Sequence, residues 1–481
     1  MRPSALLSLA ALATALAGCD MAPHYAPPAN PAPPQWPQGA AYPPAQPGQA
    51  GLPWRQVFTD ARLQTVIDTA LANNVDIAAS LASVTEARAQ YHVERSYQLP
   101  TINGSADATG TRSIDGHAAN SQTFEAGAGA SSFELDLFGR VKNQTRESLE
   151  TYLSTESGYR SARLTLVANV ATAWVTLAAD RDLETIERQD VASAARSVQL
   201  EQSLFDAGLA AGSDVASAQA TLEGLKSDLA AQVTSVAQDR NALERLAGGP
   251  LADDLLPAAL GEIDAGLTVV PAGVSSDVLL RRPDVVEAEH TLKGSYAAIG
   301  AARAAFFPQI TLTSSIGVAS TALRSMFSSA ALAATGTAAA SMPLLGGTAP
   351  GNLEYARAQR DYALAEYKAA AQNAFKDVAD ALARRGTITD QRGAQDRYVA
   401  AAKRAWDLAD VQYRAGTGAY INDLTAQRTF YAAQQTRVAT VLADLTNRVT
   451  LYSAIGADDT LAGPVDAEAA RLSKREQPSA K

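Results

Sequence analysis

The sequence contains a single cysteine, Cys19, in 481 residues, so no disulfide can form within the chain. Aromatic residues make up only 6% of it, while alanine is abundant. Proline, the strongest helix breaker, is absent from residues 101–249 and 351–463. These absences favour long, closely packed helices over a thick apolar core.

The net charge and the hydropathy of the chain exclude two further classes, nucleic-acid-binding proteins and proteins that span a membrane by internal helices. The formal net charge is −10, from 50 acidic and 40 basic residues, and no basic cluster stands out. Nucleic acid is therefore excluded as a partner. Beyond the N-terminus, no apolar run is long enough for a transmembrane helix. If the chain crosses a bilayer, it does so by another route.

The residues that would signal catalysis are also scarce. The four histidines, His24, His92, His117 and His290, lie far apart and lack metal-ligand spacing. No phosphate loop or nucleophile motif occurs. The run Arg281-Arg282-Pro283-Asp284 suggests an ion pair at a helix start, because proline favours the first helical turn. We therefore expect no enzyme activity, cofactor or metal site.

The N-terminus has the layout of an export signal. Arg2 precedes an apolar stretch that ends in Leu16-Ala17-Gly18-Cys19. This motif resembles the lipobox of bacterial lipoproteins, which implies a signal peptide over 1–18 and lipid on Cys19. The alternative is an ordinary signal peptide with an incidental cysteine. Asp20 resembles the inner-membrane retention signal of enteric bacteria, so the sorting is left open.

Residues 19–54 are rich in proline, alanine, glycine and glutamine. A segment of this composition is extended and buries too little surface to fold alone. The sequence predicts a tether from the lipid to the folded body.

The mature sequence is a tandem duplication with a constant offset of 208 residues. The turn FDAGLAAGSDVASAQ at 205–219 corresponds to YRAGTGAYINDLTAQ at 413–427. Without gaps, the same offset matches Pro100 with Pro308, Tyr159 with Tyr367, Arg240 with Arg448 and Gly248 with Gly456. The period is too long for a solenoid repeat, so each copy is a whole structural half.

Each half contains two stretches of strand-like alternation. Ile102, Gly104, Ala106 and Ala108 alternate with polar residues, and the second half repeats this from Ile310. A partner strand follows in each half, which predicts hairpins at 101–137 and 309–345. The alternation shifts near Ser131-Ser132, which suggests a bulge. Strands of about ten residues are long enough to cross a bilayer.

The remainder of each half has the pattern of long helices. Residues 140–207 contain one glycine, and Leu166, Val170, Trp174 and Leu177 follow helical spacing. A helix of such length needs neighbours along its length. The Ala-Gly turns at 207–212 and near 416 then reverse the chain, because glycine commonly ends helices in a left-handed conformation. The sequence predicts long helices over 140–248 and 351–456.

Four strands cannot close a membrane barrel, and lipid does not tolerate free strand edges. One chain is therefore insufficient, and three copies would supply twelve strands. The alternative is that the hairpins are water-exposed and cap a helical bundle.

Several motifs resemble the TolC-like outer-membrane factors of tripartite efflux systems, in their lipoprotein, NodT-type branch. The segment 279–317 contains Arg281-Arg282-Pro283-Asp284, Ile299-Gly300-Ala301-Ala302-Arg303 and Phe306-Phe307-Pro308. FELDLFGR at 133–140 and the stretch from Trp54 to Asn74 are also similar. The resemblance covers residues 54–457.

This resemblance implies an α+β membrane protein with four strands per chain, pooled by a homotrimer into a twelve-stranded outer-membrane barrel. A long α-helical barrel would continue it through the periplasm. The implied partners are outer-membrane lipid, a periplasmic adaptor and an inner-membrane transporter of the RND type. The implied adaptor-binding tips are Ala207, Gly208, Leu209, Ala415, Gly416 and Thr417.

The resemblance also implies a periplasmic gate. Tyr413 matches a family tyrosine that bonds between neighbouring helices, and its first-half counterpart is Phe205. The family's gate carboxylates correspond to Asn422 and Thr425, with Asp423 between them and Asp214 at the matching position in the first half. An acidic ring at Asp423 and a solvated aspartate on a helix face both fit this pattern. Gly418 replaces an arginine of some relatives, so fewer salt links are expected.

We therefore expect a passive exit channel of a tripartite efflux pump. The alternatives are a lipid-tethered periplasmic scaffold and a type I secretion duct. The expected segments are a signal peptide (1–18), a tether (19–54), a first repeat (55–257), an equatorial linker (258–274), a second repeat (275–457) and a flexible tail (458–481).

Overall fold

The computed structural model describes residues 20–43, 52–112, 121–268, 275–328 and 331–461. The chain divides into two compact units. Unit 1 consists of the described residues of Met1–Ala29, Ala82–Glu156 and Glu287–Lys368. Unit 2 consists of those of Asn30–Leu81, Ser157–Val286 and Ala369–Lys481. Each half of the duplication contributes to both units, because its long helices run from one unit into the other.

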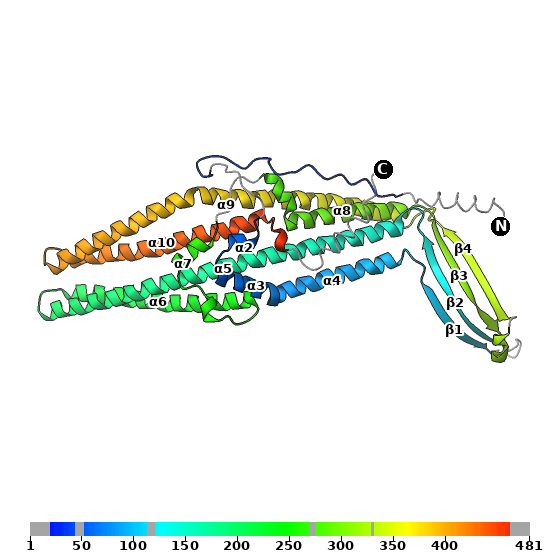
Figure 1. Ribbon diagram of the computed structural model, residues 1–481, viewed down its shortest axis with the longest axis horizontal. Helices are drawn as coiled ribbons and strands as arrows, with labels where there is room; N and C mark the ends of the chain where they lie inside the picture. The colour runs from blue at the N-terminus through cyan, green and yellow to red at the C-terminus, as the bar shows by residue number, and fades with distance from the viewer. Residues whose placement is uncertain (1–19, 44–51, 113–120, 269–274, 329–330, 462–481) are drawn as a thin grey trace. The chain divides into compact units, whose positions relative to one another are not determined.

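Unit 1 contains one antiparallel sheet of four strands in the order β1-β2-β3-β4 (Figure 1). The strands are β1 (Ile102–Thr111), β2 (Ser121–Leu135), β3 (Gln309–Ser320) and β4 (Leu332–Ser341). The two predicted hairpins are present as β1–β2 and β3–β4. The sequence did not predict that β2 pairs with β3, which joins the two halves into one sheet.

The register of the β2–β3 pair shifts between Ala130 and Phe133, where the sequence suggested a bulge. Ser132 has φ of 52°, so the extra residue is accommodated in a left-handed conformation. Its backbone N–H donates to the Thr313 hydroxyl, 3.2 Å away. The bulge therefore leaves this N–H with a partner although the ladder is interrupted.

Within the described part of the chain, no segment covers either edge strand of the sheet. All ten residues of β1 and all ten of β4 are exposed. Apolar side chains on them include Ile102, 66% exposed, and Leu332, 61% exposed. A sheet with exposed apolar side chains and two free edges has no core of its own and requires a further partner.

Long helices make up most of the remaining described residues. The largest are α5 (Arg140–Asp206), α6 (Gly212–Ala247), α9 (Ala349–Arg414) and α10 (Tyr420–Ile455). The shorter elements are α2 (Trp54–Val57), α3 (Ala61–Asn73), α4 (Val75–Ser96), α7 (Leu260–Ile263), α8 (Pro283–Ala304), η1 (Asp253–Leu255), η2 (Asp264–Gly266), η3 (Ser276–Arg281), η4 (Leu323–Phe327) and η6 (Asp459–Leu461). Helix α8 begins at Pro283, as the sequence predicted.

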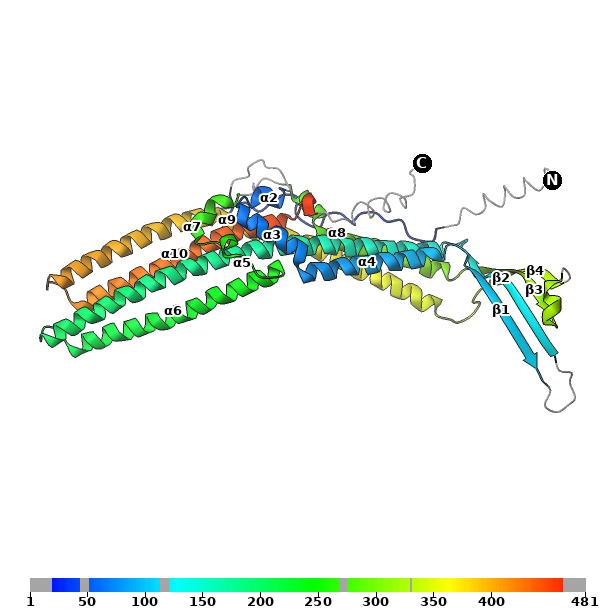
Figure 2. The same ribbon diagram turned by 60° about the horizontal axis from the view of Figure 1, so that its bottom comes forward.

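Helix α5 follows the predicted apolar spacing, since Val170, Trp174 and Leu177 are fully buried. By length and composition alone, an 18-residue window of α5 is apolar enough to cross a membrane, contrary to the sequence expectation. Because 61% of that window is buried inside the chain, α5 has the character of a core helix. In unit 2, α5 and α6 form one helical hairpin and α9 and α10 form another (Figures 1 and 2).

Segments expected to be loose make specific contacts. In unit 2, Trp36 of the proline-rich segment stacks on Phe375 with ring centroids 4.9 Å apart. Asp264 of the linker pairs with Arg392 and Arg448 at 2.9 Å each. At the start of the expected tail, Asp458 accepts from the Trp54 backbone N–H at 2.8 Å. These polar and aromatic contacts hold the described residues of these segments against unit 2, and the expected signal peptide (1–18) and residues 462–481 of the expected tail lie outside the described residues.

Candidate functional site: the two helical turns

The two helix–turn–helix connections of unit 2 have the same backbone geometry. The amide N–H of Gly208 donates to the Phe205 carbonyl at 2.8 Å, and that of Gly416 donates to the Tyr413 carbonyl at 2.9 Å. Both glycines have φ of +73°. The next amides, of Leu209 and Thr417, donate further back into the preceding helix. This left-handed cap satisfies the last carbonyls of α5 and α9 and reverses the chain.

The surface of these turns is open. The predicted tip residues are all exposed: Ala207, Gly208, Leu209, Ala415, Gly416 and Thr417. A Cβ placed on Gly208 or Gly416 would meet no atom within 4 Å. Leu209 is 76% exposed and is the largest apolar side chain of the set. A partner can therefore reach the backbone of both turns and one apolar contact point.

Tyr413 links the two halves of the chain near these turns. Its hydroxyl donates to Oε1 of Glu201 on α5, at 2.5 Å. Its ring packs against Tyr420 of α10, with centroids 5.4 Å apart. Burial and the Glu201 carboxylate raise the pKa of Tyr413 well above its usual value, so the phenol remains protonated and donating. The predicted inter-helix bond is thus made here within one chain.

Glu201 is the residue that the sequence analysis missed. It is fully buried, and its Oε2 has no hydrogen-bond partner. Burial raises the pKa of Glu201, the Tyr413 hydroxyl lowers it, and the charge of Asp214 raises it. The sequence offered one clue. The residue equivalent to Glu201 in the second half, 208 positions later, is Ala409, so the carboxylate occurs in only one copy of the repeat.

Asp423 is buried within its own chain, with 5% of its surface exposed. It is therefore not a solvated aspartate on a helix face. Burial raises its pKa to about 6, with a further contribution from the nearby charge of Asp410. Its Oδ1 has no hydrogen-bond partner. Asp423 faces the helix packing at the tip rather than open solvent.

The remaining predicted gate residues lie in different surroundings. Asp214, in the first turn of α6, is partly exposed and lies close enough to influence the pKa values of both Glu201 and Tyr413. Asn422 and Thr425 are exposed, and the Thr425 hydroxyl donates to the Ile421 carbonyl at 2.7 Å. The structure therefore gathers Tyr413, Glu201, Asp214 and Asp423 at the tip, and leaves Asn422 and Thr425 on the outside.

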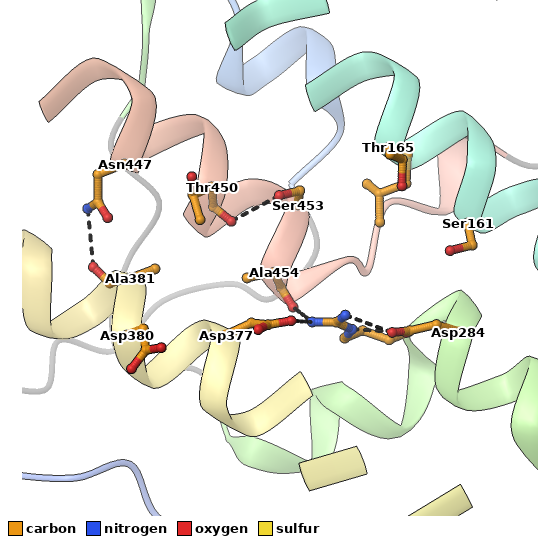
Figure 3. A pocket seen from close by; sticks show the side chains of 12 residues that line it. Ser161, Thr165, Asp284, Asp377, Asp380, Ala381, Asn447, Thr450, Ser453 and Ala454 are labelled. Carbon is orange, nitrogen blue, oxygen red and sulfur yellow. Dashed lines mark hydrogen bonds and ion pairs between the residues drawn. The ribbon is translucent and has the colours of Figure 1, made fainter. Parts of the chain in front are cut away.

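The arginine-proline motif shapes a second polar site in unit 2. Arg282 pairs with Asp284 at 2.7 Å, and its Nη1 donates to the Ala454 carbonyl at 2.7 Å. Asp377 is the second carboxylate near this guanidinium, at 3.5 Å, and Figure 3 shows it opposite Asp284. The cavity beside them has a volume of about 420 Å³. Because its arginine is committed to structural bonds, the motif holds the start of α8 against the end of α10.

Two further predictions concern metal and lipid. Among the residues that the structure describes, no group of three or more histidine, cysteine, aspartate or glutamate side chains is arranged to hold a metal ion. Cys19, the predicted lipid site, lies outside the described residues.

A family model described as "Outer membrane efflux protein" matches the chain twice, over residues 66–249 and 274–457. The chain belongs to this outer membrane efflux protein family. The two matches start 274 − 66 = 208 residues apart, which is the offset of the tandem duplication. The family resemblance drawn from the motifs is confirmed, and the family is one of transport proteins of the outer membrane.

Relatives match over nearly the whole chain. The probable efflux pump outer membrane protein TtgC of Pseudomonas putida is 39% identical over 465 residues, which are 94% of this chain and 95% of TtgC. The cation efflux system protein CusC of Escherichia coli K12 is 35% identical over 468 residues, 95% of this chain and all of CusC.

Solved structures give the same result for the fold. A crystal structure of CusC has a TM-score of 0.83 at 34% identity, covering 91% of this chain and 100% of that one. The open state of the Neisseria gonorrhoeae MtrE outer membrane channel has a TM-score of 0.79 at 33% identity, covering 92% of this chain and 99% of MtrE. The predicted fold class is confirmed for the chain: a duplicated α+β outer-membrane protein.

Proposed function

We propose that this protein is the passive outer-membrane exit channel of a tripartite efflux pump. The observation that carries the proposal is the four-stranded sheet, whose edge strands β1 and β4 are exposed over every residue. In a bilayer both edges require backbone partners, because lipid accepts no hydrogen bonds. Further copies of the chain supply those partners and close the barrel.

The family resemblance favours three copies, which pool twelve strands. The helices then continue the duct on the periplasmic side, and the lipid on Cys19 attaches each chain to the membrane. A periplasmic scaffold does not fit as well, since it has no use for a sheet that lacks a core. The family is a transport family, and we propose no catalytic step.

The assembly is tested by crosslinking the strand edges. Cys19 is replaced by serine behind an ordinary signal peptide, and Ser105→Cys in β1 is combined with Thr337→Cys in β4. A bifunctional maleimide should then give covalent dimers and trimers, with the ladder ending at three. In the control, Ser105→Cys is combined with Ser315→Cys, whose strand β3 is paired on both sides within its own chain. Monomers only, or a ladder that continues past three, would contradict the closed trimer.

We further propose that the two helical turns dock on a periplasmic adaptor, which couples to an inner-membrane transporter of the RND type. Both turns expose backbone and small side chains, and two per chain give six docking points in a trimer. The relatives' names include toluene, antibiotic and cation pumps. Cargo selection is accordingly assigned to the transporter rather than to the duct.

The docking is tested by Gly208→Asn combined with Gly416→Asn. Asparagine accepts the left-handed conformation better than other residues with a Cβ, so each change costs about 1 kcal/mol while adding a side chain in open space. Export, measured as drug tolerance of a deletion strain, should be lost while the trimer still forms. Gly224→Asn, in the exposed middle of α6, is the matched control and should keep export. Unchanged drug tolerance in the double variant would contradict the proposed docking role of the turns.

We propose that Tyr413, Asp214, Asp423 and Asn422, with Glu201 added, form the periplasmic gate. The bond from Tyr413 to Glu201 joins α9 to α5 next to the turns, so opening the tip requires breaking it. Asp214 and Asp423 set the local charge, and Asn422 is the exposed polar member. The acidic members of this gate are the buried carboxylates of Glu201 and Asp423 and the partly exposed Asp214.

A further inference from the structure

The first described residues, 20–29, lie against the helices of unit 1. The Tyr25 hydroxyl donates to Oε1 of Glu289 on α8 at 3.1 Å, and the Tyr25 ring meets that of Tyr296 edge-on with centroids 5.5 Å apart. Arg303, near the end of α8, donates to the Met21 carbonyl at 3.2 Å. A segment with these contacts has a fixed register on the helices and is more than a spacer.

Asp20 makes the most polar contacts of this segment. Its carboxylate accepts from the Asn143 side-chain amide at 3.0 Å and from the Arg146 guanidinium at 3.0 Å, both on α5. The Lys142 ammonium lies 3.9 Å away. The carboxylate also accepts from the Ala22 backbone N–H, which folds the segment over it. One short side chain is thus bound by three residues of one helix and by its own backbone.

The electrostatics agree with this geometry. Partial burial raises the pKa of Asp20, but the hydrogen bonds from Asn143 and Ala22 and the charge of Arg146 outweigh it and lower the pKa overall. Asp20 is therefore ionised, as its cationic partners require.

The helix residues that contact this segment are shaped to receive it. Asn143 is fully buried, and its amide nitrogen is shared between Asp20 and the Gly139 carbonyl. A Cβ at Gly300 of α8 would lie 2.7 Å from that amide and 2.8 Å from the Ala22 side chain. Only glycine leaves this space open. The equivalent position in the first half, 300 − 208 = 92, is histidine, consistent with one such segment per chain.

The location of these contacts matters for the membrane. Helix α5 begins at Arg140, five residues after β2 ends at Leu135. Arg146 is six residues further, which is about 9 Å along a helix. Asp20 is thus bound within two helical turns of the start of α5, and it directly follows Cys19 in the sequence.

We propose that Asp20 is a positioning residue, which docks on Asn143 and Arg146 to hold Cys19 at the membrane-facing end of α5. This proposal rests on the proposed lipidation of Cys19, because the docked position places the acyl chains where the barrel meets the inner leaflet. A carboxylate engaged in this way is not free to act as a retention signal once the chain has folded. The aspartate after the lipid-bearing cysteine therefore serves the fold.

The docking is tested on unlipidated protein, so that it does not depend on the lipid. Cys19 is the only cysteine, and an ordinary signal peptide without a lipobox leaves its thiol free for a spin label in the full mature chain. The label should be mostly immobilised in the wild-type trimer. Asp20→Ala and Arg146→Ala should each raise the ratio of mobile to immobile label about tenfold, since each removes a charge-assisted hydrogen bond. Their combination should add little more.

A control variant and an assembly check make the spin-label result interpretable. His24→Ala changes an exposed residue of the same segment and should leave the label immobilised. A label that is equally mobile in the wild type and in Asp20→Ala, or full additivity of the two changes, would overturn the proposal. Because the trimer is checked separately on gels, a variant that fails to assemble is recognised as such, and Asp20→Asn then serves as the milder replacement.

A second arm uses the lipidated protein and separates docking from sorting. If Asp20 acts by docking, Asp20→Ala and Arg146→Ala should have the same effect on the share of protein in the outer-membrane fraction. A shift with Asp20→Ala alone would mean that the aspartate acts as a sorting signal, against the proposal. Failure of palmitate to label wild-type Cys19 would refute the lipidation itself, whereas the spin-label result would still decide the docking.

Discussion

Tyr413 and Phe205 occupy equivalent positions in the two halves, but only Tyr413 can donate a hydrogen bond. Its acceptor Glu201 corresponds to Ala409, so neither member of the pair is duplicated. This bond connects α9 with α5, and the equivalent residues Phe205 and Ala409 lack the hydroxyl and the carboxylate that a matching bond would need. At the scale of single residues, the repeat is therefore asymmetric where the gate is proposed.

Tyr413→Phe should loosen the tip. The change leaves the buried Glu201 carboxylate without its donor, which costs about 1–3 kcal/mol. Single-channel recordings in planar bilayers should show more frequent opening than in the wild type. Glu201→Gln keeps an acceptor and removes the charge, so it should open less often than Tyr413→Phe. Identical opening in the wild type and Tyr413→Phe would rule the bond out as part of the gate.

The buried Asp423 predicts a pH dependence of tip stability. Its pKa is raised to about 6, above the 3.8 of an unperturbed aspartate, so folding favours the protonated form. The stabilisation is fully present below pH 3.8 and is lost as the pH rises through about 6. The hydrogen-exchange protection factors of the α9–α10 turn, which divide out the intrinsic pH dependence of exchange, should therefore be larger at pH 5 than at pH 7.5.

Asp423→Asn provides the control for this pH effect. Asparagine has a similar shape and does not titrate, so the difference between pH 5 and pH 7.5 should shrink. Because Glu201 also has a raised pKa, some dependence should remain. An undiminished difference would show that Asp423 is not its source.

At the scale of elements, the sheet depends on close approach of β2 and β3. A Cβ at Gly129 would lie 2.3 Å from the Ser314 carbonyl oxygen, and one at Gly127 would lie 2.8 Å from that of Ile316. Contacts of this kind against backbone cannot be relieved by rotating a side chain. Glycines at these points allow the strong twist and coiling that a closing barrel needs.

Gly129→Ala should therefore block assembly. Overpacking against backbone costs about 1–3 kcal/mol or more, concentrated at the junction between the two halves. The SDS-resistant oligomer in outer-membrane fractions should be lost or strongly reduced. Gly336→Ala in β4 is the matched change, because a Cβ there meets nothing within 4 Å. Equal oligomer yield from both variants would contradict the close-approach argument.

At the scale of the whole molecule, the net charge determines which ions the channel favours. The chain carries a formal net charge of −10, and three copies in a trimer would surround one lumen. A negative potential in a pore concentrates cations and repels anions, most strongly at low ionic strength. In the proposed pump the inner-membrane partner would supply the transport energy, so this field would act only as a filter.

The channel should accordingly prefer cations. In planar bilayers with a salt gradient, the reversal potential should have the sign of cation selectivity. The preference should weaken as the salt concentration rises, since screening shortens the reach of the charges. A reversal potential at zero, or of anion-selective sign, would contradict this prediction.

The sequence alone was sufficient for much of the fold. Period-two alternation identified the strands and the bulge near Ser131-Ser132, and the absence of proline identified the long helices. The constant offset of 208 residues identified the two halves, because each position of a repeat keeps its backbone role. Gly208 and Gly416 show this with identical φ of +73°. These features depend on local backbone preferences, which short stretches of sequence express.

Only the tertiary structure decided the pairings between distant residues. Nothing local in the sequence indicates that β2 pairs with β3, that Glu201 accepts from Tyr413, or that Asp20 binds Asn143 and Arg146. Burial also decided against one alternative for Asp423. The sequence allowed a solvated aspartate on a helix face, whereas the side chain lies inside the helix packing. Local backbone geometry is a property of neighbouring residues, whereas burial and charge pairing depend on which segments meet in space.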